Sequence, residues 1–488
     1  MRVIGEGHRR GVRIGLLTGL AALALATALA AVTMAAPGLD FIHTRRNLSG
    51  TITLISAHPD LAVSPDGDLV VVAWTEGYEP GASDKGHVYL RAASESGSGW
   101  GSRIEAFRGD SQACAEYVAV AVSGTTAHVA YIVREECGTP SQVEVHYKTC
   151  SLPNGPCKAS EEVASVSMSQ FRIKSLDLTL DADGNPHVVW DSLENEGGNL
   201  SDGDILYRAR TSGGWGDQEN VATSGDNRGP AIAQADGYVH VVWEENTDHL
   251  ILYRRRGASG WDASVTIYSP LLNLPAGNPN VAAGSGRVFV VWNCCSNWED
   301  PSSYCSTYHL VYRRSNDNGA AWGLAQNTTF EVGTSYRYPV DFDRLENYAS
   351  ADEGNNYLLY LQPAITLNGD GWPAVVWHVE HSEGGGGEGE GGVKDYAIYY
   401  TYALAGSSSS VDWEISPPTV LNEYRGGTWA SPVIGVGEPE PGGEQHLHVA
   451  YMQRPVDTYA WDVYYDSDEA DRYKYIYLPL TMRAYSGG

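Results

Sequence analysis

Three arginines occupy positions at which an anionic group could be bound. The sequence has 488 residues with 60 acidic against 32 basic side chains, so its formal net charge is −28 and arginine is scarce. Arg172, Arg228 and Arg425 nevertheless each precede an apolar run. A guanidinium group binds a carboxylate through two parallel hydrogen bonds. We therefore predict that these three arginines contribute to a ligand-binding site.

Carboxylates and aromatic side chains stand near the ends of other apolar runs. Glu76 and Tyr78 follow one run, Glu245 follows another, and His58 precedes a third. Carboxylates can perform acid/base chemistry on a sugar, and aromatic rings can stack on it. The alternative is that these side chains are solvated loop residues of an acidic protein. Only a fold that gathers these segments at one place would make them a site.

A repeated pattern supplies such a fold. An apolar run ending in Trp or Tyr recurs seven times. A second apolar run follows in six units, and a Gly/Ser turn leading to another Trp follows in five. Consecutive apolar residues indicate strands covered on both faces, as in stacked four-stranded sheets. We predict an all-β, seven-bladed β-propeller, with six blades or a row of β-sandwiches as alternatives. The seven runs are Val70–Trp74, His128–Tyr131, His187–Trp190, His240–Trp243, Phe289–Trp292, Ala374–Trp377 and His448–Tyr451.

The propeller is expected to span residues 44–482. Leu48–Ile55 resembles an outer strand without a blade of its own, and pairing it with the last blade would close the ring. The Gly/Glu-rich tract 384–392 is expected to be a solvated loop. Histidines 128, 187, 240 and 448 occupy equivalent positions, which predicts a repeated structural role, such as a hydrogen bond between blades, in preference to metal binding.

The N-terminal segment has the features of an export signal. Four arginines precede an uncharged apolar run over 14–36. Residues 1–36 are therefore expected to be a cleaved signal peptide, or alternatively a retained membrane anchor. Seven cysteines fit an oxidising compartment. Cys150 could pair with Cys157 across a turn, Cys114 with Cys137, and Cys294 or Cys295 with Cys305.

One turn carries a family resemblance. Ser315-Asn316-Asp317-Asn318-Gly319-Ala320-Ala321-Trp322 resembles the Asp-box, or BNR repeat, of sialidases and related propellers, with Ser315, Asp317, Gly319 and Trp322 at its defining positions. In that family the box is a structural turn. The resemblance also implies an arginine triad whose first member lies in a Phe-Arg-Ile-Pro motif. The nearest match is Phe171-Arg172-Ile173-Lys174, which lacks the proline and enters the third repeat instead of the first.

These observations predict a secreted or cell-surface module that binds a glycan or a protein ligand. The alternatives are a sialidase-like glycoside hydrolase and a structural surface protein. An acidic chain is a poor partner for nucleic acid, and a membrane contact is expected only through residues 1–36 if they are retained. We expect no cofactor and no metal site, and the sequence identifies no catalytic residue.

Overall fold

The computed structural model describes most of the repeat region. Contacts divide the chain into Met1–Asp40 and Phe41–Gly488, and all described residues lie in the second unit. The predicted export segment, the loop 384–392 and Tyr78 lie outside them. The described ranges are 46–50, 54–77, 86–94, 99–110, 113–135, 141–196, 199–269, 276–295, 308–322, 357–382, 394–406, 411–413, 419–425, 431–436, 445–453 and 462–470.

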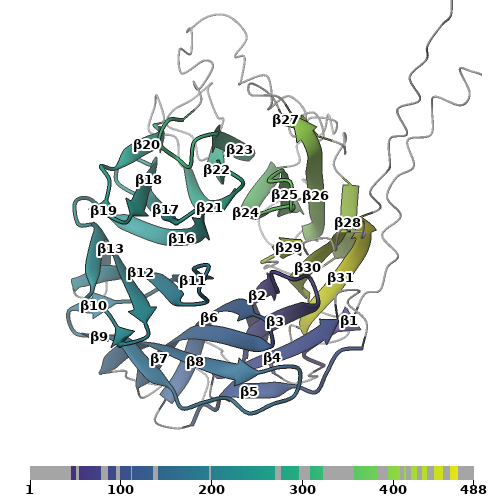
Figure 1. Cartoon of the computed structure of the whole chain (residues 1–488), viewed down its shortest axis with the longest axis horizontal. Helices are drawn as coiled ribbons and strands as arrows, with labels where there is room; N and C mark the ends of the chain where they lie inside the picture. Colours follow the sequence, from purple (N-terminus) through teal and green to yellow (C-terminus); the bar gives the residue numbers. More distant parts are fainter. Residues whose placement is uncertain are drawn as a thin grey trace, which may run out of the picture. The chain divides into compact units, whose positions relative to one another are not determined.

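Seven antiparallel sheets stand around a ring (Figure 1). The first strands of the blades pack on one another in chain order, and the last of them packs on the first. The prediction of a seven-bladed propeller is thus confirmed, and the six-bladed and sandwich alternatives are wrong. The first strands of blades 1 to 7 are β2 (Ser56–Val63), β6 (Ala113–Ser123), β11 (Leu176–Leu180), β16 (Asn227–Ala235), β21 (Ala276–Gly284), β24 (Tyr357–Leu367) and β29 (Val433–Val436).

The second strands carry the repeated apolar runs. Val70 through Trp74 are all completely buried, because neighbouring blades cover both faces of the sheet. Each large apolar side chain buried in this way contributes about 1.5–3 kcal/mol. The second strands of blades 1 to 7 are β3 (Leu69–Glu76), β7 (Thr126–Glu135), β12 (Pro186–Glu196), β17 (Tyr238–Glu245), β22 (Arg287–Cys295), β25 (Pro373–Ser382) and β30 (Gln445–Gln453).

The third and fourth strands form the outer part of each blade. Within the described residues blade 5 has three strands. The third strands are β4 (His87–Ser94), β8 (Gln142–Ser151), β13 (Asn199–Thr211), β18 (Leu250–Gly257), β23 (Tyr308–Ser315), β26 (Lys394–Gly406) and β31 (Asp462–Ala470). The fourth strands of blades 1, 2, 3, 4 and 6 are β5 (Ile104–Phe107), β9 (Glu161–Ser167), β15 (Glu219–Ala222), β20 (Val265–Tyr268) and β28 (Thr419–Arg425), and short added strands are β10 (Phe171–Arg172), β14 (Gly214–Trp215), β19 (Gly260–Trp261) and β27 (Val411–Trp413).

Blade 7 takes its fourth strand from the N-terminal part of the chain. β1 (Arg46–Asn47) pairs antiparallel with β31, and the Leu48 N–H donates to the carbonyl of Val463. This strand begins slightly earlier than the predicted segment 48–55. The carboxylate of Asp462 accepts hydrogen bonds from Asn47 Nδ2 at 2.7 Å and Ser49 Oγ at 2.9 Å. Backbone pairing and a buried carboxylate therefore both join the two ends of the ring.

The four equivalent histidines act within their own blades. Each one is hydrogen-bonded through Nδ1 to a tyrosine of the adjacent third strand, so the expected bond between blades is corrected. The tyrosine ring makes the contact between blades, because a tryptophan of the next blade around the ring packs edge-on against it. The sets are His128–Tyr147–Trp215, His187–Tyr207–Trp261, His240–Tyr253–Trp322 and His448–Tyr465–Trp100.

In blades 2 to 5, a basic side chain of the third strand forms a second link between blades. This basic residue directly follows a tyrosine of the third strand, and it donates to a carbonyl in the outer strand of the preceding blade. That carbonyl belongs to the extra residue of a β-bulge, which is left out of the strand pairing and needs another donor. The pairs are Lys148–Ala106, Arg208–Val163, Arg254–Val221 and Arg313–Ile267.

The Asp-box residues form a compact turn after β23. Ser315 Oγ donates to Asp317 Oδ1 and accepts the N–H of Gly319, while Asp317 Oδ1 accepts the N–H of Ala321. Gly319 has φ +77°, which favours glycine, and a Cβ there would collide with the hydroxyl of Tyr253. The turn packs on blade 4 and is structural.

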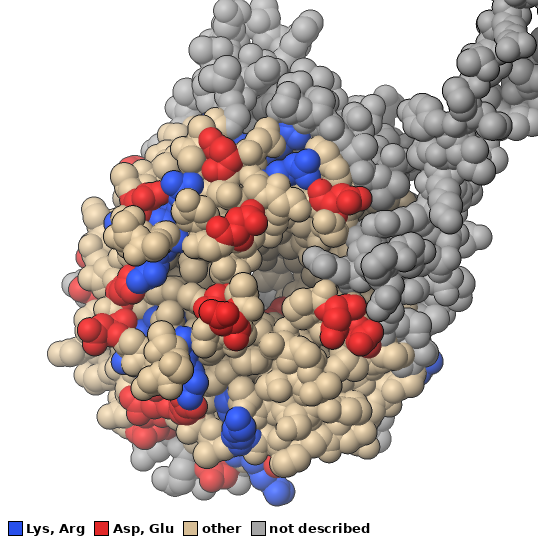
Figure 2. Space-filling view, viewed as in Figure 1, with Lys and Arg blue, Asp and Glu red and all other residues tan. Residues whose placement is uncertain are grey.

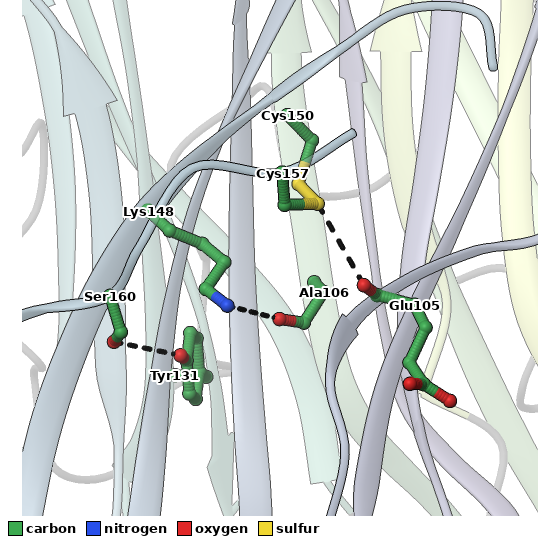
Figure 3. Close-up of a disulfide and its surroundings, with 7 residues drawn as sticks. All are labelled: Glu105, Ala106, Tyr131, Lys148, Cys150, Cys157 and Ser160. Atoms are coloured by element: carbon green, nitrogen blue, oxygen red, sulfur yellow. Dashed lines mark hydrogen bonds between the residues drawn. A yellow bond between two sulfur atoms is a disulfide. The ribbon is translucent and has the colours of Figure 1, made fainter. Parts of the chain in front are cut away.

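A disulfide joins Cys150 at the end of β8 to Cys157 in the following loop (Figure 3). Cys114 is buried in β6, Cys295 ends β22, and Cys137 and Cys305 lie outside the described residues. The other cysteine pairings therefore stay predictions.

Removing this disulfide is expected to destabilise blade 2. The bridged cysteines are 7 residues apart. Closing so short a loop lowers the conformational entropy of the unfolded chain, which stabilises the folded protein by about 2.5 kcal/mol. The double variant Cys150→Ser/Cys157→Ser should lose that much free energy of unfolding in urea denaturation. Adding a reductant should lower the stability of the wild type only. An unchanged midpoint would contradict the expectation.

Candidate functional site

The first strands begin with a bulge that brings neighbouring blades together. The bulges fall at equivalent points of β2, β6, β16, β21 and β24. In four of them the first bulge residue has φ near +50° and the second is proline, which lacks an N–H and suits a bulge. The sequence reasoning missed this signal, an X-Pro pair before a short apolar run. The four pairs are His58-Pro59, Gly229-Pro230, Asn278-Pro279 and Gln362-Pro363.

We call the face where first strands begin and second strands end the mouth. Figure 2, which views one face of the ring, shows that the ring is hollowed at its centre. A bulge re-aims the side chains that it contains. The bulge residues His58 and Tyr117 of adjacent blades consequently meet, with their ring centroids 4.1 Å apart. Ser431 Oγ, just before β29, donates to Gln362 Oε1 of the β24 bulge at 2.8 Å.

His58 and Tyr117 form an aromatic pair between blades 1 and 2. His58 Nδ1 lies 3.3 Å from Thr75 Oγ1, and both rings are half-buried. Burial lowers the pKa of His58 to about 4, so its imidazole is neutral at physiological pH. The pair therefore presents uncharged ring surface beside polar groups, which suits a ligand with both apolar and hydroxylated faces.

A buried ion pair flanks this aromatic pair. Glu116 is only 1% exposed, and its carboxylate lies 2.6 Å from Arg134 Nη2. Burial, and then the charges of Glu116 and Asp191, raise the pKa of Tyr117 and keep its hydroxyl protonated. Asp191 is itself buried and accepts the backbone N–H groups of Lys174 and Ser175. Tyr117 is thus placed between the charged groups of blades 2 and 3.

Arg228 is held by its own blade. It forms two hydrogen bonds with the carboxylate of Asp226, at 2.8 and 2.6 Å, and its side chain is 32% exposed. Glu244, at the end of β17, lies close enough to interact electrostatically with this pair, and burial raises its pKa to about 6. The positive charge of Arg228 is therefore already compensated by the carboxylate of Asp226.

Two candidate carboxylates have structural partners. Glu245 accepts the N–H groups of Asp226, Thr247 and Asp248. Burial alone would raise the pKa of Glu245, but these bonds hold it below its usual value. Glu76 is buried against Arg103, with both oxygens 3.0 Å from Nη1. The carboxylate oxygens of Glu76 and Glu245 therefore already accept hydrogen bonds from donors of the protein itself.

The remaining predicted arginines lie in strands of two other blades. Arg172 lies in the short strand β10, opposite Leu193 of blade 3. Arg425 was expected to lead into an inner strand, but it ends β28, the outermost strand of blade 6, because that strand continues through it. Arg172, Arg228 and Arg425 thus lie in blades 3, 4 and 6, and their convergence on one ligand stays a prediction.

Two aspartates line the inner edge of the ring. Asp60 and Asp177 stand at equivalent positions of β2 and β11. Each carboxylate accepts the N–H of the residue that follows it and one N–H from the first strand of the next blade. Each reaches an inner edge that has no further strand to pair with. Burial raises the pKa of Asp60 to about 6 and that of Asp177 to about 7, the charge of Asp60 adding to the latter effect. Asp177 was not singled out from the sequence.

The described part of the chain holds no group of three or more His, Cys, Asp or Glu side chains arranged to bind a metal ion. Across the same residues, no helix has the length and apolar character needed to cross a membrane.

Comparison with known proteins finds distant structural similarity and no sequence relative. No family model and no curated protein matches the sequence. Solved structures are similar to the chain at low identity. A polysaccharide lyase has 11% identity and a TM-score of 0.35 over 49% of this chain and 55% of its own. The endosialidase of phage phi92 has 11% identity and a TM-score of 0.42 over 88% and 69%. The NanB sialidase from Streptococcus pneumoniae has 10% identity and a TM-score of 0.39 over 86% and 69%.

Proposed function

We propose that the protein is an extracellular module that binds a glycan at the mouth of the ring. The contact between His58 and Tyr117 carries this proposal, because adjacent aromatic rings with polar neighbours suit the face of a sugar. Export and an oxidising environment remain part of the proposal, and the disulfide Cys150–Cys157 is consistent with them.

Binding is favoured over hydrolysis by the partners of the charged groups. Arg134 and Arg228 are paired with Glu116 and Asp226, while Glu76 and Glu245 are engaged by internal donors. The sialic acid carboxylate would therefore meet paired arginines beside further carboxylates. We propose a neutral or amino sugar as the ligand.

An array of neutral, amino and sialylated oligosaccharides tests this function. The wild-type protein should bind neutral or amino sugars and should release no fluorophore from fluorogenic sialosides or neutral glycosides. Binding confined to sialylated probes would overturn the proposed ligand class, and turnover lost in Arg228→Ala would favour an enzyme.

Glycoside hydrolysis is the second candidate, and the raised pKa values of Asp60, Asp177 and Glu244 favour it. A glycosidase needs one protonated and one ionised carboxyl group near the same bond. If this candidate holds, Asp177→Asn should abolish turnover while sugar binding persists. Turnover unchanged in Asp177→Asn would remove that carboxyl group from any catalytic role.

A further inference from the structure

Blade 2 differs from other blades at two facing positions of its second and third strands, Tyr131 and His146. Position 131 is tyrosine, as in blade 7, where the other five blades have tryptophan. Position 146 is histidine where the other blades have leucine, valine or tyrosine. The polar side chains at these positions are linked in a chain that also includes Glu144 and Ser160. Of the seven blades, only blade 2 has histidine at this third-strand position.

The order of the contacts matches an activated serine. Ser160 Oγ lies 2.8 Å from His146 Nδ1, and His146 Nε2 lies 2.6 Å from Glu144 Oε2. A carboxylate that accepts the Nε2 proton leaves Nδ1 free to accept the serine proton. His146 also stacks on the ring of Tyr131, which fixes the plane of the imidazole.

A donor is present beside the serine. Tyr131 Oη lies 3.0 Å from Ser160 Oγ (Figure 3). Burial raises the pKa of Tyr131 to about 12, so the hydroxyl remains a proton donor at neutral pH. A hydroxyl at this distance can donate to an oxyanion formed on a carbonyl attached to Ser160.

Ser160 is open to reagents. It is exposed in the loop before β9, whereas the side chains of His146 and Glu144 are only 20% and 15% exposed. The base and its carboxylate are therefore partly shielded while the nucleophile is accessible. Small, activated acyl groups suit this position better than long polymers, which would need an extended groove.

We propose that Ser160, His146 and Glu144 form a nucleophilic site that hydrolyses small, activated carboxylic esters. Ser160 Oγ attacks the carbonyl carbon and passes its proton to His146 Nδ1. The C–O bond to the alcohol breaks, and the alcohol leaves with that proton. Water then attacks the acyl group, giving a proton to His146, and the departing Ser160 Oγ takes it back. Glu144 is a positioning residue for His146. The site is separate from the mouth, so its test is independent of the proposed function.

A fluorophosphonate probe and p-nitrophenyl acetate test the site on the full chain. We expect one phosphonyl group per molecule, located on Ser160 by peptide mass mapping, and p-nitrophenol release that the same labelling blocks. Ser160→Ala should lose both, while Ser165→Ala, which changes another exposed serine of the same blade, should retain both. His146→Gln should label roughly 100-fold more slowly.

The variant Glu144→Gln tests whether Glu144 orients His146 or only stabilises the fold. It should lower the labelling rate about tenfold with an unchanged melting temperature. Glu144→Asp, which keeps a carboxylate at this position, should restore part of the labelling rate. Absence of labelling in the folded wild type, or equal labelling of Ser160→Ala, would overturn the proposal.

Discussion

Replacing Asp462 with alanine should lower the free energy of unfolding by about 3 kcal/mol. Asp462 is 4% exposed and accepts hydrogen bonds from Asn47 and Ser49, the residues that bring the N-terminal strand onto blade 7. The substitution removes these charge-assisted bonds and leaves two donors without that acceptor. Closing the ring depends on this segment, so the loss should affect the whole propeller.

Urea denaturation followed by tryptophan fluorescence measures this effect. Asp217→Ala is a suitable control because Asp217 is exposed on the outer part of blade 3. The control should differ from the wild type by less than about 0.5 kcal/mol. Equal stability of Asp462→Ala and the control would contradict the role assigned to the N-terminal strand.

Replacing Asp177 with asparagine should change how stability depends on pH. The pKa of Asp177 rises from 3.8 to about 7 in the folded protein, chiefly through burial, so the folded state keeps a proton that the unfolded chain releases. The stability gained from this proton is complete below pH 3.8 and is lost as the pH rises through about 7. Asparagine does not titrate, so this contribution disappears in the variant.

The measured quantity is the difference in free energy of unfolding between wild type and Asp177→Asn. From pH 5 to pH 6 it should shrink by about 1.4 kcal/mol, the value for one proton per pH unit, and it should be constant above pH 8. Histidines whose pKa is lowered by burial, such as His240, have the opposite pH dependence but are present in both proteins. A difference independent of pH would show that Asp177 is ionised in the folded state.

The repeat architecture could be predicted because the second strand of each blade is covered on both faces by neighbouring blades. A strand covered on both faces needs consecutive apolar residues, and the run Val70–Trp74 meets that need. Seven such runs were therefore sufficient to indicate seven blades. Pro59 and its equivalents also marked the bulges, although that signal was overlooked.

The site could be predicted only in part, because two residues of the same type can have different hydrogen-bond partners in the fold. Glu244 and Glu245 are adjacent in sequence, yet burial raises the pKa of Glu244 while three backbone N–H groups hold that of Glu245 down. Arg425 was misplaced because the end of an outer strand cannot be distinguished from the loop that follows it. Such outcomes depend on the positions of backbone donors and strand ends, which composition and spacing do not encode.

Sugar binding by Tyr117→Ala tests the central claim most directly. On the oligosaccharide array, followed by calorimetry with the best-bound sugar, Tyr117→Ala should bind at least about tenfold more weakly, a loss of about 1.4 kcal/mol. Tyr238→Ala, which removes a half-buried tyrosine at the hairpin end of blade 4, should bind as tightly as the wild type. Equal affinity of Tyr117→Ala and the wild type would contradict a binding site at the mouth.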